Sequence, residues 1–315
     1  MNMKERTILI VKLVSSHLIL LPFSIFLSLL INSASFLPIL ICQTLLIILF
    51  LSGYWEFLGL KFKIIYSFLI ELLILATAVT KFADQPVTDP NPILILLLII
   101  LQVFLMFLLG RILTVIFWKF RKSMEIIFPF STGTYLITDG GNSKISRLMN
   151  YHFYSLIHRQ NKTHYSMLYA TDIVKINNKN QKFFPPRNED YPIFGEKVFS
   201  PLSGVVIKFE NNIPDNIPYS GGYPYNSGNT IVIKNGNIFL LLGHLKHGSI
   251  RVVNGQNILQ GDWLAEAGNS GYTERPHIHM QLIECDSESY WKGIGIPILY
   301  RYKNLYKNRV VGLEN

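Results

Sequence analysis

Cysteine and charge are both scarce in this chain of 315 residues. Its two cysteines, Cys42 and Cys285, cannot build a disulfide framework or a cysteine-based zinc site. Only 16% of the residues carry charge while 50% are hydrophobic, a balance too apolar for one soluble domain. The sequence also lacks a glycine-rich phosphate loop, a nucleic-acid-binding motif and repeats of solenoid period.

Charge is distributed unevenly along the chain. Residues 1–119 hold eight lysines and arginines and five acidic residues, whereas residues 120–315 hold twenty-one and fifteen. Roughly 20 apolar residues in a helix cross the hydrocarbon core of a bilayer. Four windows approach that length: Ile8–Ile31, Phe36–Gly53, Ile64–Thr80 and Ile93–Trp118. We therefore predict an α-helical, multi-pass transmembrane region of about four spans over residues 1–119, with a lipid bilayer as its partner.

The charges that flank these windows favour one orientation. In a four-pass arrangement the flanking lysines and arginines fall on one side, and Asp84 and Asp89 fall on the other. By the positive-inside rule both termini would then be cytoplasmic. The function inferred below favours an extracytoplasmic C-terminal part, so the sequence leaves its side of the membrane open.

Beyond Lys122 the sequence turns to short β-rich runs separated by Gly, Asn and Pro, such as GVVIKF, NTIVIK and HIHMQLIE. Strands this short predict a compact all-β sandwich or barrel. We expect a juxtamembrane linker over residues 120–139 and an all-β domain over residues 140–315, with the loop Asn211–Gly228 covering its site. Nucleic acid is not an expected partner, because the basic residues are scattered and no reading helix concentrates them.

The stretch GNSGYTERPHIHMQL, residues 268–282, places two histidines two positions apart in a predicted strand. Side chains alternate along a strand, so His277 and His279 share a face with roughly 6.5 to 7 Å between them. One imidazole can then bind a metal while the other contacts a water or a substrate oxygen. By itself the pair also fits two ordinary surface histidines.

The motifs around this pair resemble the lysostaphin-type, or LytM-like, cell-wall metallopeptidases. The matching elements occur in that family's order: SPLSGVVI as the opening strand, then Gly243-His244-Leu245, Gly248-Ser249-Ile250, Val252–Gly255, Gly261–Gly268 and Gly268–His279. The resemblance covers about 165 residues, from Gly140 to roughly Tyr300. It implies the duplicated-hybrid-motif barrel or sandwich of that family and a zinc endopeptidase (a hydrolase) in the bacterial cell membrane, cleaving peptide cross-links of peptidoglycan.

The resemblance also implies a role for each matching residue. His279 and Asp172 match metal ligands, and His277 and His244 match the two catalytic histidines. These two would stabilise the attacking water or the developing oxyanion and protonate the leaving amine. Zn²⁺ is the implied cofactor, one ion per chain.

One ligand of the family pattern is missing. The first ligand stands four residues before the aspartate, and here that position is Leu168, which cannot bind zinc. Similar relatives carry an upstream Gly-Gly-Asn and an Asn-x-His instead, which Gly140-Gly141-Asn142 and Asn150-Tyr151-His152 match. We therefore predict His152 as the third metal ligand, with His164 as the second choice.

Other hypotheses stay open beside the peptidase. A degenerate relative that has lost its metal at Leu168 would act as a binding or regulatory module of the cell envelope. A phosphotransfer module also pairs histidines, but it would leave Asp172 without an ion to bind. A serine hydrolase is disfavoured, because Ser270 has no Gly-x-Ser-x-Gly frame. Trp263, Tyr223 and Tyr225 fit either a substrate groove or ordinary packing.

Overall fold

The computed structural model describes residues 22, 25, 37–83, 91–118, 122–154, 165–176, 184–221, 223–224 and 226–314. The described residues divide into two compact units, one within residues 7–114 and the other within residues 115–315. Each unit has a hydrophobic core of its own.

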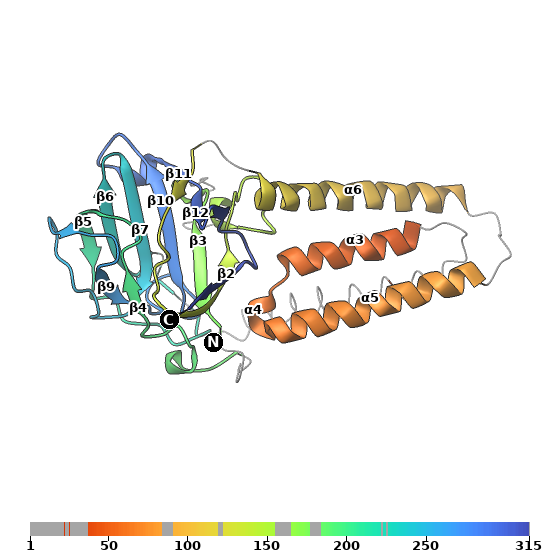
Figure 1. The fold of residues 1–315 in the computed structure, drawn as a ribbon, viewed down its shortest axis with the longest axis horizontal. Coiled ribbons are helices and arrows are strands. Elements are labelled where there is room, and N and C mark those ends of the chain that lie inside the picture. The colour runs from red at the N-terminus through yellow and green to blue at the C-terminus, as the bar shows by residue number, and fades with distance from the viewer. Residues whose placement is uncertain are drawn as a thin grey trace. The chain divides into compact units, whose positions relative to one another are not determined.

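The first unit is helical (Figure 1). Its described helices are α3 (Leu37–Ser52), α4 (Trp55–Leu58), α5 (Leu60–Ala83) and most of α6 (Pro92–Phe117). Trp55 is fully buried, and its indole Nε1 donates to the carbonyl of Leu49 at 3.0 Å. Gln102 of α6 donates to the hydroxyl of Thr44 in α3 at 3.0 Å, so a buried hydrogen bond joins these two apolar helices.

Two of these helices are long and apolar enough to cross a membrane, Leu60–Thr80 and Pro92–Phe117. The expected four spans are therefore not all found in the described part of the chain. Within the window Phe36–Gly53 the described residues Leu37–Ser52 form an apolar helix. The window Ile8–Ile31 lies outside the described residues, apart from Pro22 and Ile25, which are helical.

The second unit is mostly β-structure, as the sequence predicts. Nine strands form one antiparallel sheet in the order β14 (Val310–Leu313), β2 (Gly133–Asp139), β3 (Thr171–Lys175), β10 (Ile278–Glu284), β7 (Ile238–Leu245), β6 (Asn229–Asn235), β5 (Gly204–Glu210), β8 (Asn257–Ile258), with β11 (Ile294–Ile296) also paired to β10. Two smaller sheets are formed by β4 (Lys197–Phe199) with β9 (Trp263–Glu266), and by β1 (Met124–Glu125), β12 (Ile298–Tyr300) and β13 (Lys303–Asn304).

One face of the large sheet packs on the main core, and the opposite face carries a second, smaller hydrophobic cluster of Val232, Phe239, Leu241 and Ile283. Along β10 the side chains of Ile278, Met280 and Leu282 enter the main core. The alternate residues His279 and Gln281 point to the other face, as the period of two in a strand requires. The core side of the sheet packs against residues of β4 and β9, among them Val198, Leu264 and Ala265.

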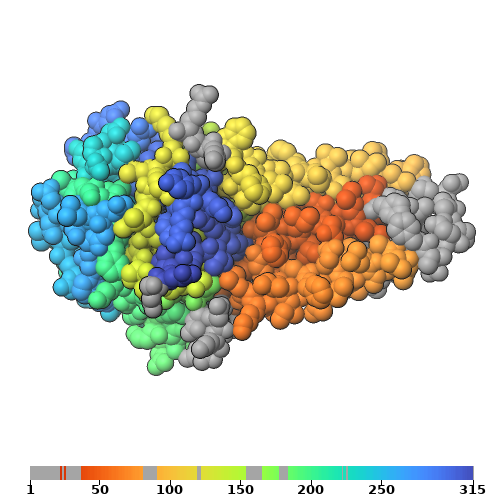
Figure 2. Space-filling model, in the orientation of Figure 1, coloured from red at the N-terminus to blue at the C-terminus, as the bar shows by residue number. Residues whose placement is uncertain are grey.

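The strand β2 lies inside residues 120–139, which we expected to be a linker. Tyr135 and Ile137 are fully buried, so this stretch belongs to the sheet and its core. β2 pairs with the C-terminal strand β14, and β1 pairs with β12. In Figure 2 the dark blue C-terminal residues lie next to the yellow residues of the same unit, in agreement with these pairings.

Candidate metal centre

Three neighbouring strands bring predicted site residues to one point on the face of the sheet opposite the main core. Asp172 of β3 lies directly opposite His279 of β10, and Gly243 of β7 lies opposite His279 on its other side. Gly243 has no side chain, and a Cβ there would approach the carbonyl oxygen of Ser227 to 3.0 Å. The strand register therefore places a carboxylate beside an imidazole and keeps the next position clear.

His152, Asp172 and His279 form a candidate metal site. Their ligand atoms all lie within 4.8 Å of one another, and all three residues are buried. His279 Nδ1 is 3.0 Å from Asp172 Oδ1, and His152 Nε2 is 3.3 Å from Asp172 Oδ2. The two oxygens of one carboxylate therefore face two different imidazoles.

The orientation of His152 is fixed by Asn150. The amide nitrogen of Asn150 donates to the carbonyls of Gly141 and Ala170, both at 2.8 Å, which identifies its other atom as the oxygen. That oxygen lies 2.6 Å from His152 Nδ1 and therefore accepts its proton. In the neutral ring the lone pair is then on Nε2, the nitrogen that faces Asp172.

The orientation of His279 is fixed by Gln281, through the opposite ring nitrogen. Its Nε2 lies 3.1 Å from Oε1 of Gln281, which stands on the same face of β10. A proton on Nε2 satisfies this contact and leaves the lone pair of the neutral ring on Nδ1, toward Asp172. A hydrogen bond to the distal nitrogen is the usual support of a metal-binding histidine.

The two remaining histidines flank this centre. His277 Nδ1 donates to the carbonyl of Arg275 at 2.9 Å, and its Nε2 is 3.6 Å from Asp172 Oδ2. His244 Nδ1 donates to the carbonyl of Ser270 at 2.8 Å, and its ring centroid is 4.7 Å from that of His277. The backbone at His244 has φ of +59°, a left-handed conformation that is uncommon for a residue with a side chain. Such strain is often found where a side chain must be aimed at a functional site.

Burial and the single carboxylate set the protonation of these rings. Burial lowers the pKa of His277 to about 4, and it lowers the pKa of His244 well below its usual value. For His152 burial also opposes charge, but the attraction of Asp172 outweighs it and raises the pKa. For Asp172 burial opposes charge too, yet His152 and His277 together hold the pKa of the carboxyl well below its usual range.

The donor set fits a zinc ion. Zinc prefers imidazole nitrogen and carboxylate oxygen in tetrahedral sites with bonds of about 2.0 to 2.2 Å, so neighbouring donors lie roughly 3.3 to 3.5 Å apart. The observed 3.0 and 3.3 Å between Asp172 and the two histidines are close to that spacing. Two lone pairs that face carboxylate oxygens at these distances require a proton or a metal cation between them.

The remaining residues that the sequence singled out are Leu168, His164, Ser270, Tyr223, Tyr225 and Trp263. The carbonyl of Leu168 accepts hydrogen bonds from the backbone N–H and the hydroxyl of Ser143. His164 lies outside the described residues, and so does Tyr225. The buried hydroxyl of Ser270 donates to the carbonyl of Leu245 and accepts from a backbone N–H, a structural role. Tyr223 is buried, and Trp263 stands on the small sheet of β4 and β9.

Two supporting residues were not predicted, Asn150 and Gln281. Gln281 follows His279 by two positions, so the alternation of a strand could have placed it beside the metal centre. Asn150 is part of the Asn-x-His motif, but its contact with the His152 ring depends on a local turn that the sequence does not reveal.

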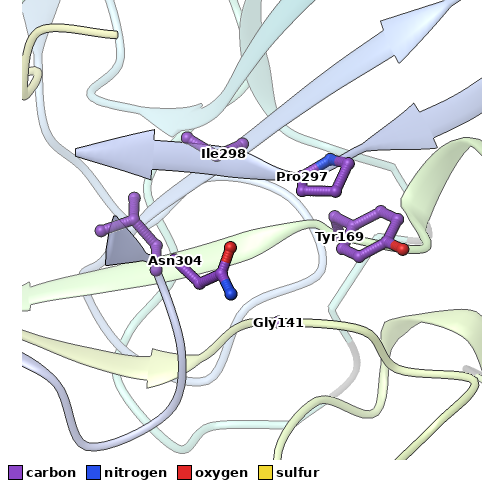
Figure 3. A pocket seen from close by; sticks show the side chains of 6 residues that line it. Gly141, Tyr169, Pro297, Ile298 and Asn304 are labelled. Atoms are coloured by element: carbon purple, nitrogen blue, oxygen red, sulfur yellow. The ribbon is translucent and has the colours of Figure 1, made fainter. Parts of the chain in front are cut away.

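The same domain has a pocket that none of the candidate site residues His152, Asp172, His244, His277 and His279 lines. Figure 3 shows it around Gly141, Tyr169, Pro297, Ile298 and Asn304, with Leu305 completing the lining. Tyr169 accepts a hydrogen bond from Asn142, so one wall of this pocket is tied to the turn that precedes His152.

The fold and the site together define a mostly-β domain with a candidate metal centre of two imidazoles and one carboxylate. Residues 190–290 match the sequence model of Peptidase family M23. This match includes His244, His277 and His279, whereas His152 and Asp172 precede it. Residues 190–290 are therefore an M23-type region of the chain.

Known proteins match parts of this chain. A stretch of 67 residues is 40% identical to Endolysin 2638A of Staphylococcus phage 2638A, covering 20% of this chain and 14% of the endolysin. A zinc-containing peptidase from Vibrio cholerae matches 53% of this chain and 37% of its own, at 22% identity and a TM-score of 0.31. The catalytic domain of lysostaphin from Staphylococcus simulans matches 43% of this chain and 77% of its own, at 19% identity and a TM-score of 0.28. The chain thus spans well under two thirds of the endolysin and of the Vibrio peptidase.

Proposed function

We propose that this protein is a membrane-anchored, zinc-dependent endopeptidase that hydrolyses peptide bonds in peptidoglycan cross-links. The observation that carries the proposal is the arrangement of four buried imidazoles around one carboxylate. Each ring gives its outer nitrogen to a hydrogen-bond acceptor, namely Asn150, Gln281, Arg275 or Ser270. Each ring therefore keeps its other nitrogen for the centre.

His152, Asp172 and His279 would hold the ion. When bound, zinc supplies Lewis-acid activation of a water and of the scissile carbonyl. Three protein ligands of this kind are typical of catalytic zinc sites, in which a further position remains open. Asn150 and Gln281 would keep the two ligand rings in the required tautomers.

His277 and His244 would handle protons. In each neutral ring Nδ1 carries the proton and donates it to a backbone carbonyl, so Nε2 is a proton acceptor. Nε2 of His277 or His244 can take a proton from the attacking water and then give it to the leaving amine. A ring protonated in this way also donates a hydrogen bond to a developing oxyanion.

The membrane part of the proposal is supported by the apolar helices. Large side chains on the outer surface of α5 and α6 are exposed, among them Phe68, Val79, Val103 and Phe107. Exposed faces this apolar fit lipid better than water. We propose a bacterial cell membrane anchor and an extracytoplasmic β-domain, because peptidoglycan lies outside the cytoplasm.

The test combines metal content with cleavage. The full-length chain in detergent should hold one zinc and cleave peptidoglycan fragments, and a chelator should stop the cleavage reversibly. Less than a tenth of a zinc per chain, with no cleavage, would favour a metal-free binding or regulatory module instead. Protease digestion of the β-domain in intact cells tests the location, because a domain shielded inside the cytoplasm contradicts a role on cell wall.

A further inference from the structure

The small sheet of β4 and β9 presents three side chains on its outer surface. They are Lys197 in β4, Trp263 in β9, and Arg251 in the segment on the other side of β9. The backbone N–H of Arg251 donates to the carbonyl of Leu264, which places its segment beside β9. The neighbour of each residue turns inward and is buried: Val198, Leu264 and Val252. Trp263 therefore stands between two basic side chains from two adjacent segments, and Figure 1 labels β4 and β9.

Both basic groups lie over the same indole. Lys197 Nζ is 4.4 Å from the ring centroid of Trp263, and the guanidinium carbon of Arg251 is 3.8 Å from it. The two cations are therefore no more than about 8.2 Å apart. The indole Nε1 donates to the carbonyl of Ala265 at 2.9 Å, which fixes the ring between them. Like charges this close repel each other unless an anion lies nearby.

The carboxylates that neighbour Lys197 and Trp263 in the sequence or in the strand register have other hydrogen-bond or ion-pair partners. Glu266 lies opposite Lys197 in the strand register, but Lys246 binds it at 2.6 Å. Glu196 precedes Lys197 in sequence, and Lys175 binds it at 2.5 Å. Asp262 accepts the backbone N–H of Leu259 at 2.8 Å. Within the described part of the chain, no ion pair joins Lys197 or Arg251 to a carboxylate.

We propose that Lys197, Trp263 and Arg251 form a binding site for the phosphate groups of a flexible, phosphate-rich polymer other than nucleic acid. The guanidinium of Arg251 offers a planar pair of donors that matches phosphate oxygens, and Lys197 adds a second positive charge. The six excess positive charges of residues 120–315 attract a polyanion rather than a single small ion. This site shares no residue with the candidate metal centre, so it is independent of the proposed peptidase activity.

Binding can be measured with linear polyphosphate as the probe. The full-length chain is placed in nanodiscs of neutral phosphatidylcholine and titrated with polyphosphate, with inorganic phosphate, and with vesicles that contain phosphatidylglycerol. We expect polyphosphate to bind much more tightly than inorganic phosphate. Because the double variant Lys197→Gln, Arg251→Gln removes both positive charges of the site, it should weaken polyphosphate binding at least tenfold.

A matched control separates this site from the overall charge. Lys234 of β6 pairs with Glu288, and Lys208 lies in β5. The double variant Lys208→Gln, Lys234→Gln therefore removes two positive charges at another place in the domain. This control should bind polyphosphate within about threefold of the parent. Equal weakening in the test and control pairs would overturn the proposal. Unchanged binding in the Lys197→Gln, Arg251→Gln variant would overturn it too, as would binding to the anionic vesicles without binding to polyphosphate.

Discussion

Replacing Asn150 by alanine tests whether His152 is a metal ligand without touching the ring itself. Asn150→Ala removes the acceptor for His152 Nδ1 and releases the tautomer that points Nε2 at Asp172. Loss of such a supporting hydrogen bond typically lowers metal affinity 10- to 100-fold, which corresponds to about 1.4 to 2.8 kcal/mol of binding free energy.

The same substitution has a separate cost in stability. The side chain of Asn150 donates to the carbonyls of Gly141 and Ala170, and the variant leaves both without this partner. The oxygen of Asn150 also accepts the backbone N–H of His152 at 3.1 Å. At about 0.5 to 1.5 kcal/mol for each of these three hydrogen bonds, the free energy of unfolding of the metal-free chain should fall by about 1.5 to 4.5 kcal/mol. Zinc affinity is measured by competition with a chelating dye, and stability by urea unfolding in the presence of chelator.

Asn142→Ala is the matched control. Asn142 is a buried asparagine of the same segment, and it donates to Tyr169 and accepts the backbone N–H groups of Lys144 and Ile145. It contacts no histidine among the described residues, so its loss should reduce stability by a similar amount and leave zinc affinity within about threefold. If Asn150→Ala binds zinc as tightly as Asn142→Ala does, then Asn150 does not orient a ligand. If His152→Ala also binds as the parent does, then His152 is not a ligand.

Three further predictions concern the other site residues. His279→Ala should abolish zinc binding and hydrolysis, whereas His277→Ala should keep the ion and lose turnover; equal metal loss in both would contradict their separate roles. Folding lowers the pKa of His277 from 6.5 to about 4, so the unfolded chain binds more protons than the folded chain between these pH values. The metal-free chain should therefore lose up to about 3 kcal/mol of stability as the pH falls through this window, as measured by urea unfolding. His277→Gln should make the stability less dependent on pH over the same range. Ser270→Ala should unfold about 1 to 3 kcal/mol more easily but keep cleavage at saturating zinc, because its hydroxyl bonds to Leu245 and does not attack substrate; complete loss of turnover in a folded variant would refute this.

The strand periodicity of the sequence was sufficient for much of the site. His277 and His279 both lie beside Asp172 of β3, so the shared face predicted from alternation is confirmed. The place of Asp172 was predicted only from the family resemblance, because alternation does not fix which residues of two strands lie opposite each other. The contact between His152 and Asp172 could not be derived in this way, because it depends on a turn held by side-chain hydrogen bonds. Of the four apolar windows, two correspond to described helices that are long and apolar enough to cross a membrane.

The structure suggests why leucine at position 168 is compatible with a metal centre. The backbone of Leu168 accepts two hydrogen bonds from Ser143, and the carbonyl of Ala170 accepts one from Asn150. The segment just before Asp172 therefore supports the turn that carries His152, through its carbonyl groups and independently of its side chains. A histidine side chain at position 168 is not needed for this support, since the imidazole that meets Asp172 arrives from the supported turn. The proposed ligand set thus depends on the backbone of one segment and the side chain of another.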